Sequence, residues 1–400
     1  MEGAATRSWL AVCIASAIVC LLAIYKGGTE PMALSIASVM TVAMLVVAPG
    51  KWLHGADQWR WLVMPLAVIV TIAIHAVWLN PEGRTRAYFE CVAWFGIGFG
   101  ITFVTAHATP RMRRMIVAIV AALVLFQVIY GFAEYLRGSR FIFGRWERGA
   151  DVLTGTFVNR NHVADVISAG SLVVIGSIIQ SRVAIPVRVA IAGCLWVGCA
   201  LAVIATQSRL GLIALIAGSL VLAFASSAPL IRRRPISAAG VALALLLAAG
   251  LWFGPGALLE RFAGLFAAED RKLLWSHLLS QPMSTWLQGI GPGQFEDVFK
   301  TLSPATLTRS YPEAHNDYLE FVFEFGVMGT IIVLLGASVT LAGRWGRGHH
   351  YAPAWAGLMV FAIHAAGDFP LQVPGSAALF WLILGLALAP LGDRQRRSND

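Results

Sequence analysis

Apolar segments long enough to cross a lipid bilayer recur along the whole chain. A membrane-spanning helix needs about 20 consecutive apolar residues, and the sequence offers twelve such candidates. Hydrophobic residues make up 58% of the 400 residues and charged residues only 13%, which excludes an ordinary soluble protein. The expected spans are 9–25, 31–50, 61–79, 87–106, 115–136, 163–180, 189–206, 210–228, 236–254, 318–341, 352–369 and 375–391. We therefore expect a single all-α polytopic membrane domain over residues 1–400, with about twelve transmembrane helices.

The N-terminal segment could be a signal peptide, because Arg7 precedes a 17-residue apolar stretch. The residues that follow, 26–30, contain no small-x-small cleavage site. We therefore expect a retained first helix.

The basic residues indicate how the chain crosses the membrane. None of the 30 Lys and Arg residues falls within an expected span. With the N-terminus inside, the inner segments hold sixteen of them and the short outer loops hold four. Cytoplasmic loops carry such an excess of positive charge, so both termini are expected in the cytoplasm. The basic clusters are scattered over separate short loops, which argues against nucleic-acid binding.

Two longer loops, 137–162 and 255–317, lie on the outer side in this topology and hold the other ten basic residues. The arginines of the first loop are expected to bind either an anionic ligand or lipid headgroups. The second loop lies between the ninth and tenth spans. Long ordered loops are usually functional, and we expect short helices here that lie over the outer mouth of the bundle. The arginines of the first loop are Arg137, Arg140, Arg145, Arg148 and Arg160.

The positions of the cysteines and the absence of nucleotide-binding motifs argue against several kinds of site. All five cysteines fall within expected spans and no C-x-x-C occurs, so neither a disulfide framework nor a thiolate metal site is expected. The sequence also lacks a D-x-D pair and a G-x4-G-K-[S/T] loop, which would indicate a nucleotide or nucleotide-sugar site.

Four polar motifs stand at the outer ends of expected spans. Taken singly, Arg209 could snorkel, Arg271 could lie on a solvated helix face, and His162 could cap or hydrogen-bond locally. As a set, arginines and histidines from separate outer segments could converge over the mouth of one bundle. The four motifs are 154–163 with Arg160 and His162, 206–211 with Arg209, 271–275 followed by 289–293, and His315 with Asn316.

His315 and Asn316 precede Gly326 and Gly329 with a spacing that suits a helix. On a continuous helix, eleven residues at about 100° each make nearly three turns, so His315 and Gly326 would share a face, roughly 16 Å apart along the axis. Glycines on that face would let another helix pack closely. The acidic residues that flank His315 are turned away by their helical angles and are not expected to be catalytic: Asp317, Glu320 and Glu324.

These motifs resemble the signature of the bacterial O-antigen ligase family, which also includes O-antigen polymerases and some protein glycosylating enzymes. The resemblance rests on S-R-x-G, R-x-x-x-W before G-x-G-x-G, and H-N-x9-G-x-x-G-T, which occur in this order over 206–330. It implies that His315 is catalytic, that Arg209 and Arg271 bind the diphosphate of the donor, and that no metal or cofactor is needed. We expect Arg160 to bind the diphosphate as well, although its motif is less characteristic of the family. The resemblance also implies supporting roles for Asn316, Gly291, Gly326, Gly329 and Thr330.

Family members move a glycan from an undecaprenyl-diphosphate carrier to an acceptor outside the bacterial inner membrane. Guanidinium groups suit the leaving diphosphate, because they stay charged and bind phosphate oxygens bidentately. A histidine, which titrates near neutral pH, suits the acceptor hydroxyl as general base.

The acceptor is not encoded in these motifs. We expect lipid A–core as acceptor, with polymerisation of O-antigen or exopolysaccharide and protein O-glycosylation as alternatives. A twelve-helix transporter is a further alternative and would need ionisable residues along a path through the membrane. The acidic residues near span ends have no matching basic residue within the membrane, which disfavours a transporter: Glu90, Glu134, Asp165, Glu320, Glu324 and Asp368.

Overall fold

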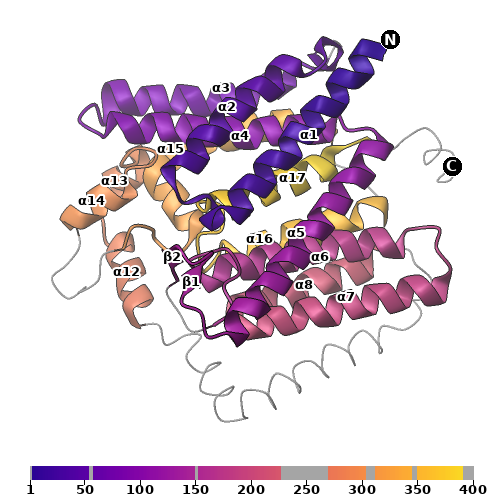
Figure 1. The fold of residues 1–400 in the computed structure, drawn as a ribbon. Helices are drawn as coiled ribbons and strands as arrows, with labels where there is room; N and C mark the ends of the chain where they lie inside the picture. Colours follow the sequence, from indigo (N-terminus) through magenta and orange to yellow (C-terminus); the bar gives the residue numbers. More distant parts are fainter. Residues whose placement is uncertain are drawn as a thin grey trace.

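The chain is almost entirely helical in the computed structural model, which describes residues 2–53, 57–148, 152–226, 269–302, 311–344 and 349–390 (Figure 1). The one β-element in these ranges is a short antiparallel hairpin of β1 (Phe141–Ile142) and β2 (Trp146–Glu147). The all-α class is thus confirmed.

The main helices are α1 (Glu2–Ile24), α2 (Pro31–Val47), α3 (Arg60–Ile74), α4 (Thr85–Ala106), α5 (Pro110–Leu136), α6 (Arg160–Ile179), α7 (Ile185–Ala205), α8 (Arg209–Ala225), α12 (Glu269–Leu279), α13 (Met283–Gln288), α14 (Phe295–Leu302), α15 (Asp317–Leu341), α16 (Ala352–His364) and α17 (Pro374–Leu388). Single turns form η1 (Lys26–Gly28), η2 (Gly50–Leu53), η3 (His75–Leu79) and η4 (His349–Tyr351).

Seven of the described helical segments are long and apolar enough to cross a membrane, so the chain is a multi-pass membrane protein. They are α1, α3 with η3, α4, α5, α6, α7 and α15. Three shorter apolar helices, α2, α8 and α17, accompany them. The expected span 236–254 lies outside the described residues, so the number of twelve spans stays a prediction.

Prolines and capping side chains set where the helices begin. Pro31, Pro110 and Pro374 stand at the first helical position, where the missing N–H costs no hydrogen bond. Asn159, Ser208 and Asn316 are the N-caps of α6, α8 and α15, and each side-chain oxygen accepts a backbone N–H of the first turn. The caps fix three helix N-termini that carry sequence motifs.

Helix α6 is the central helix of the bundle, with 83% of its apolar segment buried.

Small residues let α15 and α3 approach each other closely. A Cβ at Gly329 would lie 2.7 Å from Thr71 Cγ2, and one at Gly336 would lie 2.7 Å from Ala67 Cβ. Both neighbours belong to α3, so the expected glycine-mediated packing of α15 occurs at Gly329.

Short helices occupy the described part of the 255–317 loop. α12, α13 and α14 lie at the end of the bundle opposite the N-terminus (Figure 1). They pack on α15 through a separate apolar cluster made of Leu274, Leu278, Ile290, Phe295, Phe299, Tyr311, Ala314 and Phe323. This cluster gives the short helices a core of their own, because they lie outside the main bundle core.

The expectation that α15 is continuous from His315 past Gly326 is wrong. Gly326 has φ +69° and ψ 163°, a conformation available almost only to glycine, and it interrupts the helix. The carbonyls of Phe323 and Glu324 accept the N–H groups of Ile290 and Gly291, at 3.0 and 2.9 Å. A Cβ at Gly326 would meet the backbone of Gln288, the last residue of α13, and of Gly289. The glycine therefore admits the 288–291 segment at a break in the helix.

Candidate functional site

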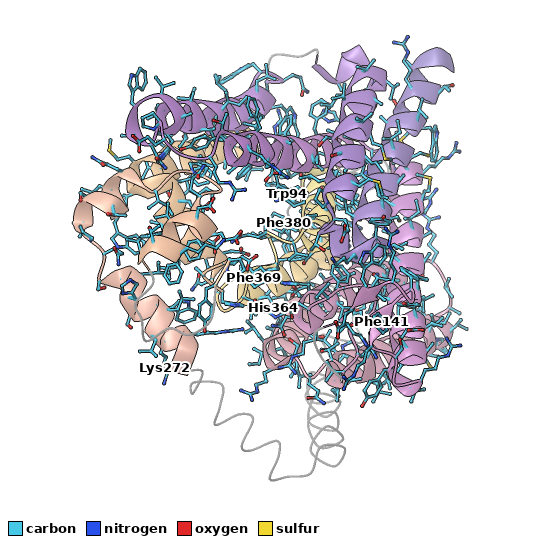
Figure 2. The ribbon with its side chains drawn as sticks, turned by 60° about the vertical axis from the view of Figure 1, so that its left-hand side comes forward. Trp94, Phe141, Lys272, His364, Phe369 and Phe380 are labelled. Atoms are coloured by element: carbon cyan, nitrogen blue, oxygen red, sulfur yellow. The ribbon has the colours of Figure 1, made fainter. Side chains whose placement is uncertain are left out.

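The site forms around the connection between α16 and α17, which we call the 365–373 loop. The sequence predicted a span through residue 369, but α16 ends at His364 and Asp368 lies beyond it. Pro370 cannot continue a helix and disfavours helical geometry at residue 369, and Pro374 is the first residue of the next helix, α17. Figure 2 shows His364 and Phe369 in the interior of the molecule.

His315 makes its principal polar contact with Asp368. Its Nδ1 lies 3.2 Å from Asp368 Oδ1, and the two side chains are 21% and 1% exposed. An ionised carboxylate can only accept, so Nδ1 carries the hydrogen, and in the neutral imidazole Nε2 is then the nitrogen with the lone pair. The pair has the arrangement in which a carboxylate fixes the tautomer of a histidine base. His315 has φ 53°, an uncommon backbone conformation that turns it out of the helix.

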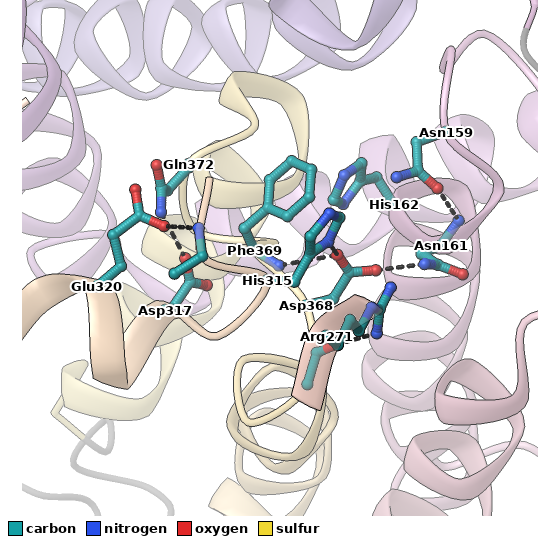
Figure 3. A network of polar contacts seen from close by, with 12 residues as sticks. Asn159, Asn161, His162, Arg271, His315, Asp317, Glu320, Asp368, Phe369 and Gln372 are labelled. Carbon is teal, nitrogen blue, oxygen red and sulfur yellow. Dashed lines mark hydrogen bonds and ion pairs between the residues drawn. The ribbon is translucent and has the colours of Figure 1, made fainter. Parts of the chain in front are cut away.

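Asp368 is held by further donors (Figure 3). The Asn161 amide donates to Oδ2, and the N–H of Phe369 donates to Oδ1 at 3.2 Å. Burial alone would raise the pKa of Asp368. The hydrogen bond from His315 and the nearby His162, His364 and Arg271 outweigh it and lower that pKa below its usual range. Asp368 therefore stays ionised beside the histidine.

The N-terminus of α15 is joined to the 365–373 loop by several hydrogen bonds. The Asn316 amide donates to the Ala366 carbonyl at 3.1 Å, and the Asp317 N–H donates to the Ala365 carbonyl at 2.9 Å. The carboxylate of Asp317 accepts the N–H of Leu371 at 2.9 Å. Asn316 and Asp317 thus set the position of the loop relative to His315.

The R-x-x-x-W motif acts through one face of α12, because residues four apart lie on the same side of a helix. The Arg271 guanidinium donates to the Gly367 carbonyl at 2.7 Å, and the Trp275 indole donates to the Ala314 carbonyl at 2.8 Å. Gly367 and Ala314 each directly precede a member of the His315–Asp368 pair. The motif thus holds α12 over that pair, with Arg271 beside it.

Arg160 and Arg209 stand at the first residues of α6 and α8. A helix N-terminus carries partial positive charge and exposes N–H groups, so it favours an anion. Asn161 contacts Asp368, and Leu210 approaches Gly367, where an added Cβ would lie 3.1 Å from Leu210 Cδ2. Both helix N-termini therefore lie next to the 365–373 loop.

Of the residues expected to support the site, Asn316 is in contact with the 365–373 loop, whereas Gly326, Gly329 and Thr330 lie further along α15.

Gly291 belongs to a turn that Glu324 holds. The Glu324 carboxylate accepts the N–H groups of Gly293 and Phe295, both at 2.9 Å. The Gly291 backbone has φ +104°, and an added Cβ would lie 2.6 Å from the hydroxyl of Tyr88. Glycine is thus required there by backbone conformation and close packing.

The interpretation that the acidic residues near span ends have no matching basic residue within the membrane overlooks the histidine partners of Asp165 and Asp368. Asp368 pairs with His315, and Asp165 contacts both His364 and His162. Histidine, and not Lys or Arg, is the partner of both carboxylates. A carboxylate within an apolar segment is costly to bury unless it is paired, so Asp165 could have been matched with His162, three residues before it.

Comparison with family models gives a match for residues 194–334, to the family described as O-Antigen ligase. The matched segment contains Arg209, Arg271 and His315, whereas Asp368 and Asn161 lie outside it. Comparison with curated proteins gives no match.

Proposed function

The chain carries a domain of the O-antigen ligase family at residues 194–334, and from this we propose that it is a membrane glycosyltransferase with a lipid-diphosphate donor. The proposed reaction transfers an O-antigen-type glycan from undecaprenyl diphosphate to a hydroxyl of lipid A–core. The observation that carries the proposal is the His315–Asp368 pair. His315 is a base inside the matched segment, and Asp368, which lies outside that segment, orients it.

His315 is proposed to accept the proton of the acceptor hydroxyl at Nε2. The acceptor oxygen then attacks the anomeric carbon of the glycan, and the bond from that carbon to the diphosphate oxygen breaks. The bonding electrons leave with the diphosphate. Asp368 stabilises the imidazolium that forms, because its carboxylate accepts the Nδ1 hydrogen throughout.

Arg271, Arg209 and Arg160 are proposed to bind the diphosphate. Arg271 lies beside the His315–Asp368 pair, and the other two begin helices whose N-termini adjoin the same loop. A guanidinium has five donors, so a hydrogen bond to Gly367 leaves Arg271 capacity for phosphate oxygens. The positive ends of α6 and α8 add to the attraction for the leaving group.

The proposed location is the bacterial inner membrane, with both termini in the cytoplasm and the site facing the periplasm. The excess of basic residues in the inner segments supports this orientation. The position of α12–α14 at the end opposite the N-terminus is consistent with it. Polymerisation of a lipid-linked glycan and protein O-glycosylation use the same donor and the same groups, so they remain the alternative reactions.

Two experiments test the proposal. The lipopolysaccharide gel pattern of a deletion strain distinguishes the acceptors, because lost ligation removes the polymer from lipid A–core, whereas lost polymerisation shortens the polymer.

Purified His315→Ala, assayed with a lipid-diphosphate glycan, should lose roughly 10²–10⁴-fold in rate. His315→Gln should be equally impaired if the imidazole is the base. Near-wild-type turnover of His315→Gln would instead leave His315 as a structural residue.

A further inference from the structure

One side of α6 contacts the 365–373 loop and the two helix ends that flank it. The Asn161 amide donates to the Asp368 carboxylate, and the His162 ring lies edge-to-face on Phe369 with centroids 4.8 Å apart. Phe369 in turn lies edge-to-face with His315, at 4.9 Å (Figure 3). One turn further along α6 is Asp165, whose side chain is fully buried.

Asp165 joins the two helices that the loop connects. One oxygen contacts Nδ1 of His364, the last residue of α16, and the other lies 3.5 Å from the hydroxyl of Ser376, in the first turn of α17. The His162 Nδ1 lies 3.8 Å away on Asp165's own helix. A single carboxylate therefore connects α6 to both ends of the loop that carries Asp368.

This contact is costly to break because its members are buried. Asp165 and His364 are 0% exposed and Ser376 is fully buried, within a bundle whose core is apolar. A carboxylate in such surroundings is stable only when it is paired and hydrogen-bonded, and removing one partner leaves a buried polar group uncompensated. The arrangement thus resists movement of α16 or α17 relative to α6.

We propose that Asp165 is a positioning residue for the His315–Asp368 pair, acting through His364 and the 365–373 loop. Asp165 touches no reacting atom. It holds the two ends of the loop so that the Asp368 carboxylate stays at hydrogen-bond distance from His315. The proposal rests on the proposed function only in taking His315 and Asp368 as the acid–base pair.

The test compares Asp165→Asn and His364→Gln with Ser168→Ala in the purified protein. Ser168 is a fully buried residue one turn along α6, and its alanine variant should keep kcat within about twofold. A displacement of catalytic groups by about 1 Å can cost as much as 10²-fold in rate. Asp165→Asn and His364→Gln should therefore lower kcat by about 10–100-fold, with the KM for the lipid-diphosphate donor nearly unchanged.

A double-variant cycle separates positioning from general destabilisation. If Asp165 acts through Asp368, Asp165→Asn should add almost nothing to the loss that Asp368→Asn causes alone. Losses in kcat that multiply in the double variant would overturn the proposal, and so would near-wild-type kcat in folded Asp165→Asn and His364→Gln. If Asp165→Asn does not fold, the same cycle with His364→Gln gives the decision. Full activity of His315→Ala would instead overturn the proposed function itself.

Discussion

His315 and Asp368 are 53 residues apart in sequence, yet His315 Nδ1 lies 3.2 Å from Asp368 Oδ1. The carboxylate is almost fully buried, and the histidine is partly exposed. The buried acid therefore fixes the histidine, whose second nitrogen is the one that can meet an acceptor. This relationship makes Asp368 as necessary to the proposed reaction as His315.

Asp368→Asn should reduce kcat by about 10²–10⁴-fold, because a neutral amide no longer fixes the tautomer of His315 or stabilises the imidazolium. The KM for the donor should change little, since Asp368 is not among the diphosphate-binding residues. The measurement is steady-state kinetics on the purified protein. Asp297→Asn, which removes a partly exposed acid of α14 that pairs with Arg84, is the control and should stay within about twofold. A fully active Asp368→Asn would remove the acid–base pair from the mechanism.

Arg271→Ala and Arg209→Ala should each reduce transfer by roughly 10²-fold or more, the loss typical of removing a preorganised group that stabilises developing charge. Lysine should restore little, because it lacks the bidentate geometry of a guanidinium. Arg160→Ala should have the smaller effect. Transfer assays and donor-binding measurements check this, and Arg86→Ala is the control, because Arg86 is exposed and pairs with Glu90. Unimpaired transfer in folded Arg271→Ala and Arg209→Ala would refute their role in binding diphosphate.

Much of the helical layout could be predicted from the sequence, because long apolar runs and proline positions determine where the described helices lie. The motif residues His315, Arg271 and Asn316 could be identified too, because they cluster at span ends with recognisable spacing. The pairing of Asp368 with His315 could not be predicted in this way. It depends on where the 365–373 loop folds back, and no local spacing connects residues so far apart in sequence.

Gly326 shows why a spacing can be recognised and still be misinterpreted. The distance from His315 suited a continuous helix, but the backbone leaves the helix at Gly326 to admit the Gln288–Gly289 segment. Helical periodicity describes residues along one element. It does not predict that a distant turn will supply hydrogen-bond donors to that element's carbonyls.

Gly326→Ala should destabilise the folded protein by ~3 kcal/mol or more, since alanine is strained in this conformation. Its Cβ would also come within 2.4 Å of the Gln288 carbonyl carbon. Gly343→Ala is the matched control, because Gly343 has a similar φ of +70° with nothing within 4 Å of an added Cβ. That variant should lose only about 1–2 kcal/mol. Thermal unfolding in detergent measures both, and equal losses would contradict a close approach at Gly326.

Glu313 lies outside the candidate spans, two residues before His315. Burial and, to a smaller extent, the negative charges of Glu296 and Asp368 together raise the pKa of Glu313 from 4.5 to about 7. The folded protein therefore holds this proton more tightly than the unfolded chain does. The resulting contribution to stability is fully present below about pH 4.5 and is lost as the pH rises through about 7.

Glu313→Gln tests this, because glutamine resembles the protonated carboxyl and does not titrate. The unfolding temperature of the wild-type protein in detergent should fall between pH 5 and pH 8 by more than that of Glu313→Gln. The variant should gain most over the wild type at pH 8, where the folded protein must otherwise bury a carboxylate close to Glu296 and Asp368. Identical pH dependence in the two proteins would show that Glu313 is ionised in the folded state across this range.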